Sequence, residues 1–155
     1  MQANNTGAQT AHVGARSCGP RLLSSKGRTI ANTVSEDQQE YKPLVLSVGK
    51  LHDLLSLREA ILRSAGYQVI TCTEYEETIA VIRNGRCGVM LLCYSVPDKW
   101  RRSLIRDFRD FCRQGRIIGI TNHPVVQPSR EMDELVYGIE GPEMLIQAVN
   151  RESSA

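Results

Sequence analysis

The chain has 155 residues, of which 41% are hydrophobic and 23% are charged, a composition typical of a globular protein with room for one hydrophobic core. Its formal net charge of +2 is too small to indicate that the whole molecule binds nucleic acid or a membrane surface. No apolar run approaches the length of a membrane span, and no apolar segment follows the polar first ten residues. We therefore expect neither a membrane anchor nor a secretory signal.

Composition divides the chain into unequal parts. Residues 1–42 are rich in Asn, Thr, Gly, Ser, Gln and Ala and carry few large apolar side chains. Such a segment cannot bury enough surface to offset the entropy of ordering, so we predict a disordered leader. Residues 43–151 alternate short apolar runs with amphipathic stretches, which is the pattern of a βα domain, and residues 152–155 form a short tail.

The first predicted strand covers residues 44–47 and is followed by an amphipathic helix. The apolar residues of that helix recur at helical spacing and are Leu54, Leu57, Ile61 and Ala65. Gly66 comes directly after them, where a glycine ends a helix as its C-terminal cap. A second strand is predicted at 67–72, so the chain begins with one complete βα unit and the strand of the next.

The second helix is predicted to open at Thr73 and Glu76, which have the spacing of a capping box, and to bury Ile79 and Ile82. The third strand, at 89–93, is apolar throughout, as a strand covered on both faces should be. The third helix carries a stripe of large apolar residues, Trp100, Leu104, Phe108 and Phe111.

The fourth strand is predicted at 116–121 and the fifth at 134–137. Between them, residues 122–133 contain two prolines and little periodicity, so any helix there is short. Pro142 lies at the first turn of a last helix, whose buried side chains are expected to be Leu145, Ala148 and Val149. Five strands alternating with at least four helices predict an α/β fold with a doubly wound, five-stranded parallel sheet.

Four segments of this framework resemble a response-regulator receiver domain of the CheY-like family: "GYQV", "VMLLCYSVP", "IIGIT" and "GPEMLIQAV". The resemblance covers residues 43–151. It implies the flavodoxin-like strand order 2-1-3-4-5, with a crevice at the carboxyl ends of the first and third strands. It also implies a role in bacterial two-component or phosphorelay signalling, in the cytoplasm.

The residues at the family's functional positions depart from the family's pattern. Receivers hold Mg²⁺ with two acids after the first strand, where this chain has Ser47 and Val48, and they accept the phosphoryl group on an aspartate, where it has Cys93. Thr121 keeps the family's hydroxyl, but Gly138 stands in place of the lysine. Mg²⁺ binds carboxylates and other oxygens, so the resemblance implies a degenerate receiver without metal or cofactor. An aspartate introduced at Cys93 would be unpaired there and would not restore phosphoryl transfer.

The leading hypothesis is therefore a non-enzymatic module that binds a protein partner, such as a signalling protein or a kinase, independently of phosphorylation. A second hypothesis is nucleic-acid binding by the arginine-rich third helix and the basic leader. The candidate surface for either partner consists of Trp100, Arg101, Arg102, Arg106 and Arg109. The competing interpretation of Trp100 is that it covers the core at the start of the helix, rather than anchoring a partner. Acids alternate with these arginines, as they do on an ion-paired, solvated helix face.

A third hypothesis is a thiol-based sensor at Cys93. The five cysteines are scattered and include no CxxC pair, which indicates reduced thiols and neither a disulfide framework nor a zinc site. A reactive thiol needs a nearby cation or helix N-terminus to lower its pKa. The fifth strand supplies no lysine at the matching position, so a buried structural cysteine is the competing interpretation.

Overall fold

The computed structural model describes residues 40–124, 127 and 130–151. The chain divides into two units, Met1–Tyr41 and Lys42–Ala155, and the fold below belongs to the second. Nearly all of the predicted leader and the whole of the predicted tail lie outside the described residues, so both remain predictions.

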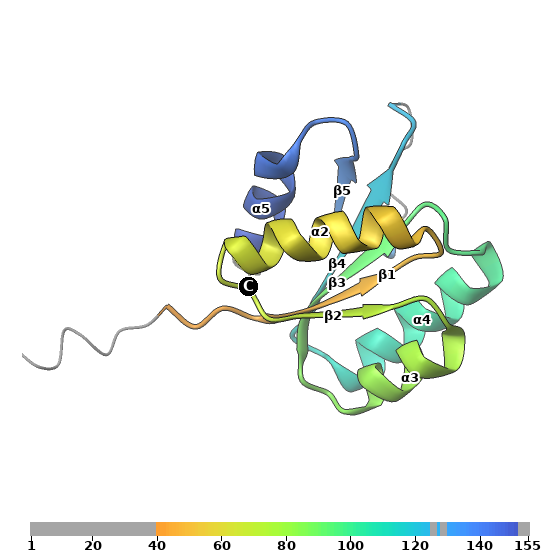
Figure 1. Cartoon of the computed structure of the whole chain (residues 1–155). Helices are drawn as coiled ribbons and strands as arrows, with labels where there is room; N and C mark the ends of the chain where they lie inside the picture. The colour runs from red at the N-terminus through yellow and green to blue at the C-terminus, as the bar shows by residue number, and fades with distance from the viewer. Residues whose placement is uncertain (1–39, 125–126, 128–129, 152–155) are drawn as a thin grey trace, which may run out of the picture. The chain divides into compact units, whose positions relative to one another are not determined.

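The domain is built on one parallel sheet of five strands, in the order β2-β1-β3-β4-β5 (Figure 1). The strands are β1 (Leu44–Val48), β2 (Val69–Cys72), β3 (Cys87–Cys93), β4 (Arg116–Thr121) and β5 (Glu134–Tyr137). Each neighbouring pair is parallel. The predicted fold class and strand order are confirmed, and the bounds of β4 and β5 are those expected from the sequence.

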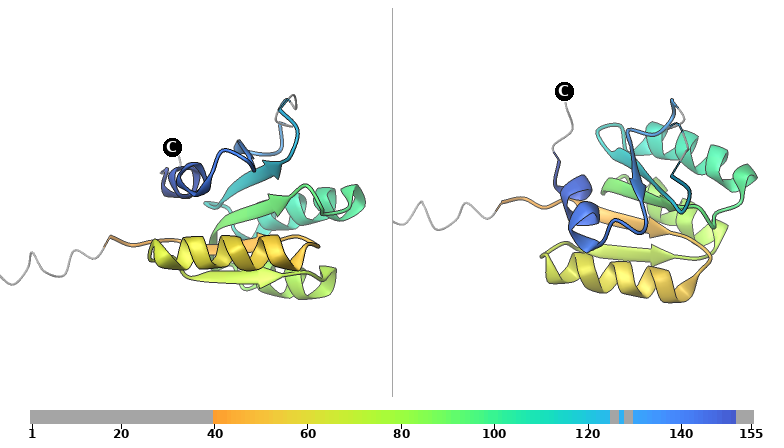
Figure 2. Two further views of the ribbon diagram at one scale, coloured as in Figure 1. Left: turned by 45° about the horizontal axis from the view of Figure 1, so that its top comes forward. Right: turned by 90° about the horizontal axis from the view of Figure 1, so that it is seen from above.

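Four described helices cover the sheet, α2 (His52–Ser64), α3 (Tyr75–Arg83), α4 (Asp98–Phe111) and α5 (Pro142–Asn150). Helices α2 and α5 lie on one face and α3 and α4 on the other, which gives three layers (Figures 1 and 2). None of the helices in the described part of the chain has the length and apolar character to cross a membrane. Described residues between β4 and β5 form no helix, in agreement with the two prolines there.

The two faces of the sheet carry separate hydrophobic clusters. Under α3 and α4, the buried side chains include Ile79, Ile82, Met90, Leu92, Leu104 and Phe108. Under α2 and α5, they include Leu62, Val89, Leu91, Leu145, Ala148 and Val149. Strand β3 contributes to both clusters in alternation, which explains why its sequence is apolar throughout.

Two sequence predictions about helix faces are corrected. Leu57 and Phe111 stand on predicted apolar stripes, yet their exposed fractions are 58% and 48%. The face of α2 that packs on the sheet is offset by one residue and consists of Leu55, Arg58 and Leu62. The sequence of α2 contains both stripes, and the position of the sheet decides which one is buried.

The predicted capping box before α3 is also not formed. The residue that caps this helix is Glu74, and no side chain bonds to the free N–H groups of its first turn. Gly66, by contrast, has the positive φ of 90° expected of a glycine that follows a helix. Pro142 begins α5 as predicted, and the three residues predicted to be buried on that helix are buried.

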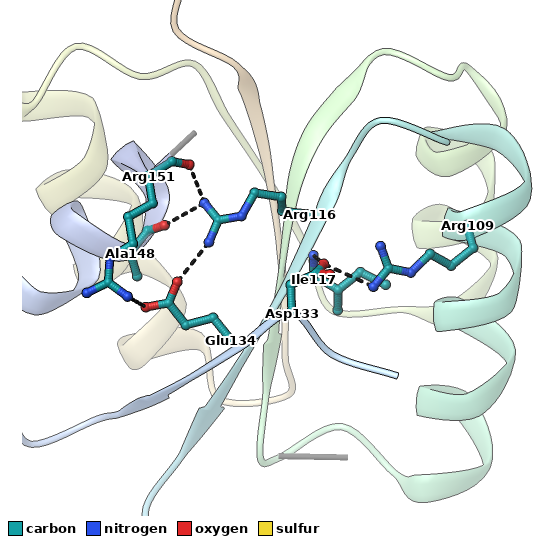
Figure 3. A network of polar contacts seen from close by, with 7 residues as sticks. All are labelled: Arg109, Arg116, Ile117, Asp133, Glu134, Ala148 and Arg151. Carbon is teal, nitrogen blue, oxygen red and sulfur yellow. Dashed lines mark hydrogen bonds and ion pairs between the residues drawn. The ribbon is translucent and has the colours of Figure 1, made fainter. Parts of the chain in front are cut away.

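A polar network closes the sheet edge where β4 and β5 begin (Figure 3). The Arg116 guanidinium pairs with the Glu134 carboxylate at 2.7 Å and donates to the carbonyls of Ala148, at 2.9 Å, and Arg151. Glu134 also pairs with the Arg151 side chain at 2.6 Å. Arg116 begins β4, as it begins the predicted fourth strand, and it ties α5 to the sheet.

Candidate functional site

The predicted site residues lie where the strands end. Ser47 and Val48 end β1 and Cys93 ends β3, and these three residues are buried. Cys93 has an exposed fraction of only 1% and packs in the same hydrophobic cluster as Val48. Thr121 ends β4, and Gly138 follows β5 at the surface. The strand ends therefore come together at one edge of the sheet, as the strand order requires.

The loop after β1 lies directly against Cys93. A Cβ added to Gly49 would lie 3.0 Å from the Cβ of Cys93 and 3.2 Å from the Oγ of Ser95. The backbone N–H of Lys50 donates to that Ser95 hydroxyl at 2.9 Å. The space above the end of β3 is thus occupied by the chain itself, and a side chain at position 49 would require its neighbours to shift.

Arg58 is a member of this site that the sequence analysis missed. It stands on α2, and its exposed fraction is 9%. Its guanidinium lies close enough to Cys93 for its charge and its N–H groups to lower the pKa of the thiol. Its Nη1 atom is buried and has no hydrogen-bond partner among the described residues. A cation therefore does lie beside Cys93, but it comes from α2 rather than from β5.

This environment changes the acidity of Cys93. Burial raises the pKa of its thiol, but hydrogen bonds from Ser95 and the hydrogen bonding and charge of Arg58 outweigh burial, so the pKa is lowered from its usual value. Burial raises the pKa of Cys72 to about 11 and that of Cys87 to about 12, and it also raises the pKa of Cys112. Of the four cysteines that the structure describes, Cys93 alone has a lowered pKa.

Thr121 and Gly138 have local structural roles. The Thr121 hydroxyl accepts a hydrogen bond from the backbone N–H of His123 at 3.1 Å. The backbone N–H of Gly138 donates to the Thr121 carbonyl at 2.8 Å. The hydroxyl that the family resemblance matched to phosphoryl binding is therefore already used in shaping the turn after β4.

These residues do not fit a magnesium ion. At the ends of β1 and β3 the side chains are a hydroxyl, an isopropyl group and a thiol, and the Arg58 guanidinium beside them would repel a cation. Mg²⁺ requires carboxylates and other oxygens in octahedral geometry. In the part of the chain that the structure describes, no three His, Cys, Asp or Glu side chains are grouped so that they could hold a metal.

The predicted partner surface on α4 is only partly available. Trp100 is half-buried at the start of the helix, with the Lys50 ammonium 4.2 Å from its ring centre and the Tyr75 ring at 5.5 Å. Arg101 donates to the carbonyls of Tyr94 and Val96. Trp100 and Arg101 thus stabilise the loops around the site.

Of the other three arginines on this surface, one is also structural. Arg109 pairs with Asp133 at 2.9 Å, and the same carboxylate accepts from the backbone N–H of Ile117 (Figure 3). Arg102 and Arg106 are exposed on α4. The exposed positive charge of this face is therefore smaller than the sequence of the helix indicates.

Comparison with known proteins identifies the fold. The chain matches no family model and no curated protein by sequence. Among solved structures, it is similar to the chemotaxis protein CheY4 of Vibrio cholerae, with 18% identity over 73% of this chain and 100% of that one and a TM-score of 0.63.

Two further solved structures agree. A CheY-like response regulator receiver domain from Methanospirillum hungatei is 19% identical over 70% of this chain and 91% of that one, with a TM-score of 0.61. The receiver domain of the sensor histidine kinase PA1611 from Pseudomonas aeruginosa, which has a magnesium ion in its active site cleft, is 21% identical over 70% of this chain and 95% of that one, with a TM-score of 0.59. The chain thus has the receiver fold.

Proposed function

We propose that this domain is a response-regulator-like signalling module that works by binding a protein partner, a signalling protein or a kinase, and does not take up a phosphoryl group. The observation that carries this proposal is the composition of the strand ends. Cys93 stands at the end of β3 beside Arg58, and the end of β1 offers no carboxylate. The receiver fold remains as a scaffold for docking.

Phosphoryl transfer depends on neutralising the charge that the transferred group carries. The similar receiver from Pseudomonas aeruginosa has a magnesium ion in its cleft, whereas the side chains of this chain at the matching strand ends do not fit one. We therefore propose a non-enzymatic domain without metal or cofactor. Buried cysteines without disulfides among the described residues support a reducing compartment, and we place the domain in the bacterial cytoplasm.

Millimolar Mg²⁺ should leave the melting temperature of the domain unchanged. A ligand raises the melting temperature only when it binds the folded state, and no described group of side chains offers the oxygens that this ion needs. Differential scanning fluorimetry over a Mg²⁺ series, with sodium chloride at matched ionic strength as the control, measures this. A saturable rise specific to Mg²⁺ would contradict the proposed absence of a metal site.

Nucleic-acid binding is the weaker proposal. Arg101 and Arg109 on α4 are engaged by carbonyls and by Asp133, and Arg116 lies in the network with Glu134. On this helix the described part of the domain still presents three exposed basic residues, Lys99, Arg102 and Arg106. Arg106 lies 3.7 Å from Asp107. These three residues are a small share of the basic surface that phosphate recognition requires.

A thiol sensor at Cys93 is favoured by a specific observation, and we retain it as the second candidate. Reactive cysteines are those whose thiolate is stabilised by a nearby cation. Arg58 provides this cation, although the sequence offered none on β5. Cys93 is buried, so such a sensor would respond only to small reagents.

The variant Arg58→Met should raise the pKa of Cys93 by about one unit or more, because an opposite charge at this range shifts a pKa by roughly 1–3 units. Methionine replaces the buried apolar stem of the arginine and removes the charge together with the N–H donors. Thiolate ultraviolet absorbance as a function of pH, in a Cys18→Ser background, measures the change. Burial raises the pKa of each of the other described cysteines, Cys72, Cys87 and Cys112, so the first transition belongs to Cys93.

The matched control is Arg63→Met, which removes an arginine of the same helix. Arg63 is 59% exposed and pairs with Glu59 at 2.8 Å, so the Cys93 transition should stay in place. Cys93→Ser should remove the first transition altogether. If the transition is unmoved in Arg58→Met, Arg58 does not stabilise the thiolate and the second candidate loses its support.

A further inference from the structure

A cavity of about 180 Å³ lies between α2, the ends of β4 and β5, and the start of α5. It is separate from the tightly packed loop above Cys93. Most of its wall is apolar and is formed by Leu54, Leu57, Ile61, Ile120, Pro142 and Leu145. Leu54, Leu57 and Ile61 belong to the stripe of α2 that the sequence predicted to be its buried apolar face. These residues line a cavity instead of packing on the sheet.

Arg58 is the charged residue of this lining. It makes no ion pair with a carboxylate in the described part of the chain, and its buried Nη1 has no hydrogen-bond partner there. A buried charge without a counter-ion is costly. The Cys93 thiol on the same guanidinium balances this charge only when it is ionised. The cavity therefore combines apolar walls with a cation that lacks a permanent anion.

The start of α5 adds little to this attraction. Its first turn already carries Glu143, an exposed carboxylate whose Oε2 lies 3.7 Å from the position of a Cβ on Gly141. A doubly or triply charged anion would be repelled by this carboxylate more than a singly charged one. The cavity thus offers an anion one cation between largely apolar walls. Such a site suits a monoanion with a hydrocarbon part better than a strongly hydrated phosphate, which would lose its water against those walls.

We propose that this cavity binds a small apolar monocarboxylic acid, with the carboxylate on Arg58 and the hydrocarbon part against the α2 and α5 walls. Cavities on the order of 150 Å³ lined by aliphatic side chains accept a molecule of the size of benzene. Ligand sites typically join such walls to one or two polar groups that fix the orientation. A carboxylate accepts charge-assisted N–H bonds from a guanidinium, which suits Arg58 better than a neutral group would.

Benzoate is the probe for this site, and benzamide is its neutral counterpart of the same shape. Titration of the folded domain, followed by backbone amide NMR shifts, should show saturable benzoate binding with the largest changes around the cavity, at Gly138 and Gly141. Benzamide and inorganic phosphate should bind at least about tenfold more weakly, the factor that one charge-assisted hydrogen bond provides. Equal binding of either one would overturn the proposal.

Two variants and one control locate the carboxylate. Arg58→Met should weaken benzoate binding by about tenfold or more, and Leu57→Glu should weaken it because a second negative charge then stands at an exposed position of the lining. Arg63→Met should bind benzoate as the unchanged chain does. Undiminished binding in Arg58→Met, or shifts confined to the opposite face of the sheet, would show that this cavity is not the site. These results do not depend on the proposed protein partner.

Discussion

Replacing Arg116 with methionine should lower the free energy of unfolding by about 3 kcal/mol, because it removes one partner from a largely buried ion pair. Glu134 then keeps only the more exposed Arg151 as its counter-ion. The Arg116 side chain has an exposed fraction of 11%, and that of Glu134 is 16%. The substitution also removes the donor that serves the Ala148 carbonyl at the end of α5. Arg151 still pairs with Glu134, which keeps the loss from being larger.

Urea denaturation followed by circular dichroism measures this loss, and Arg113→Met is the matched control. Arg113 is exposed just after α4, so its replacement should change the free energy of unfolding by no more than about 0.5 kcal/mol. If Arg116→Met lost less than about 1 kcal/mol, the network would be a surface feature of little consequence for stability.

The fold class and most of the core could be predicted because local pattern and tertiary position agree for them, whereas the strand order was implied by the family resemblance. The continuous apolar run of β3 requires cover on both faces, and the clusters around Val89 and Met90 show that cover. Gly66 and Pro142 mark helix ends by backbone geometry alone, and both lie where they were predicted. Such signals depend on a few neighbouring residues.

Arg58 could not be placed from the sequence, because the phase of α2 is set by the sheet. A stripe one residue out of phase is about 100° away around the helix, so the apolar residues at 54, 57 and 61 pointed to a different buried face. One signal was present: Arg58 follows Leu55 by three residues and precedes Leu62 by four, so it interrupts an apolar stripe. An arginine in that position is either exposed or held by a specific partner.

Arg116 and Arg109 show that a charge pattern in the sequence does not reveal which charged side chains remain exposed. The arginines of the third helix look like one charged face in the sequence, and Arg116 is the first residue of the predicted fourth strand. Neither pattern shows which carboxylate each arginine meets. Helix α4 ends at Phe111, Arg116 belongs to β4, and Arg109 reaches Asp133. Which charges remain exposed depends on contacts across 18 to 24 residues of sequence, such as Arg116 with Glu134 and Arg109 with Asp133.

The position of Arg58 changes what we expect of the Cys93→Asp variant. From the sequence, that carboxylate was expected to be unpaired at a buried strand end. In the structure it would be beside the Arg58 guanidinium, and an ion pair there would stabilise the carboxylate form. Pairing makes the variant easier to fold, but it also occupies the oxygens that would attack a phosphoryl donor.

Intact-mass measurement of the Cys93→Asp variant, after incubation with acetyl phosphate and Mg²⁺, tests the loss of phosphoryl chemistry most directly. Circular dichroism first shows that the variant is folded, and a receiver with an intact aspartate and metal pair serves as the positive control in the same reaction. We expect no added phosphoryl mass, because Ser47 and Val48 offer no carboxylate to the ion and Gly138 offers no cation to the phosphoryl oxygens. Added phosphoryl mass that disappears when Mg²⁺ is removed would contradict the proposed function.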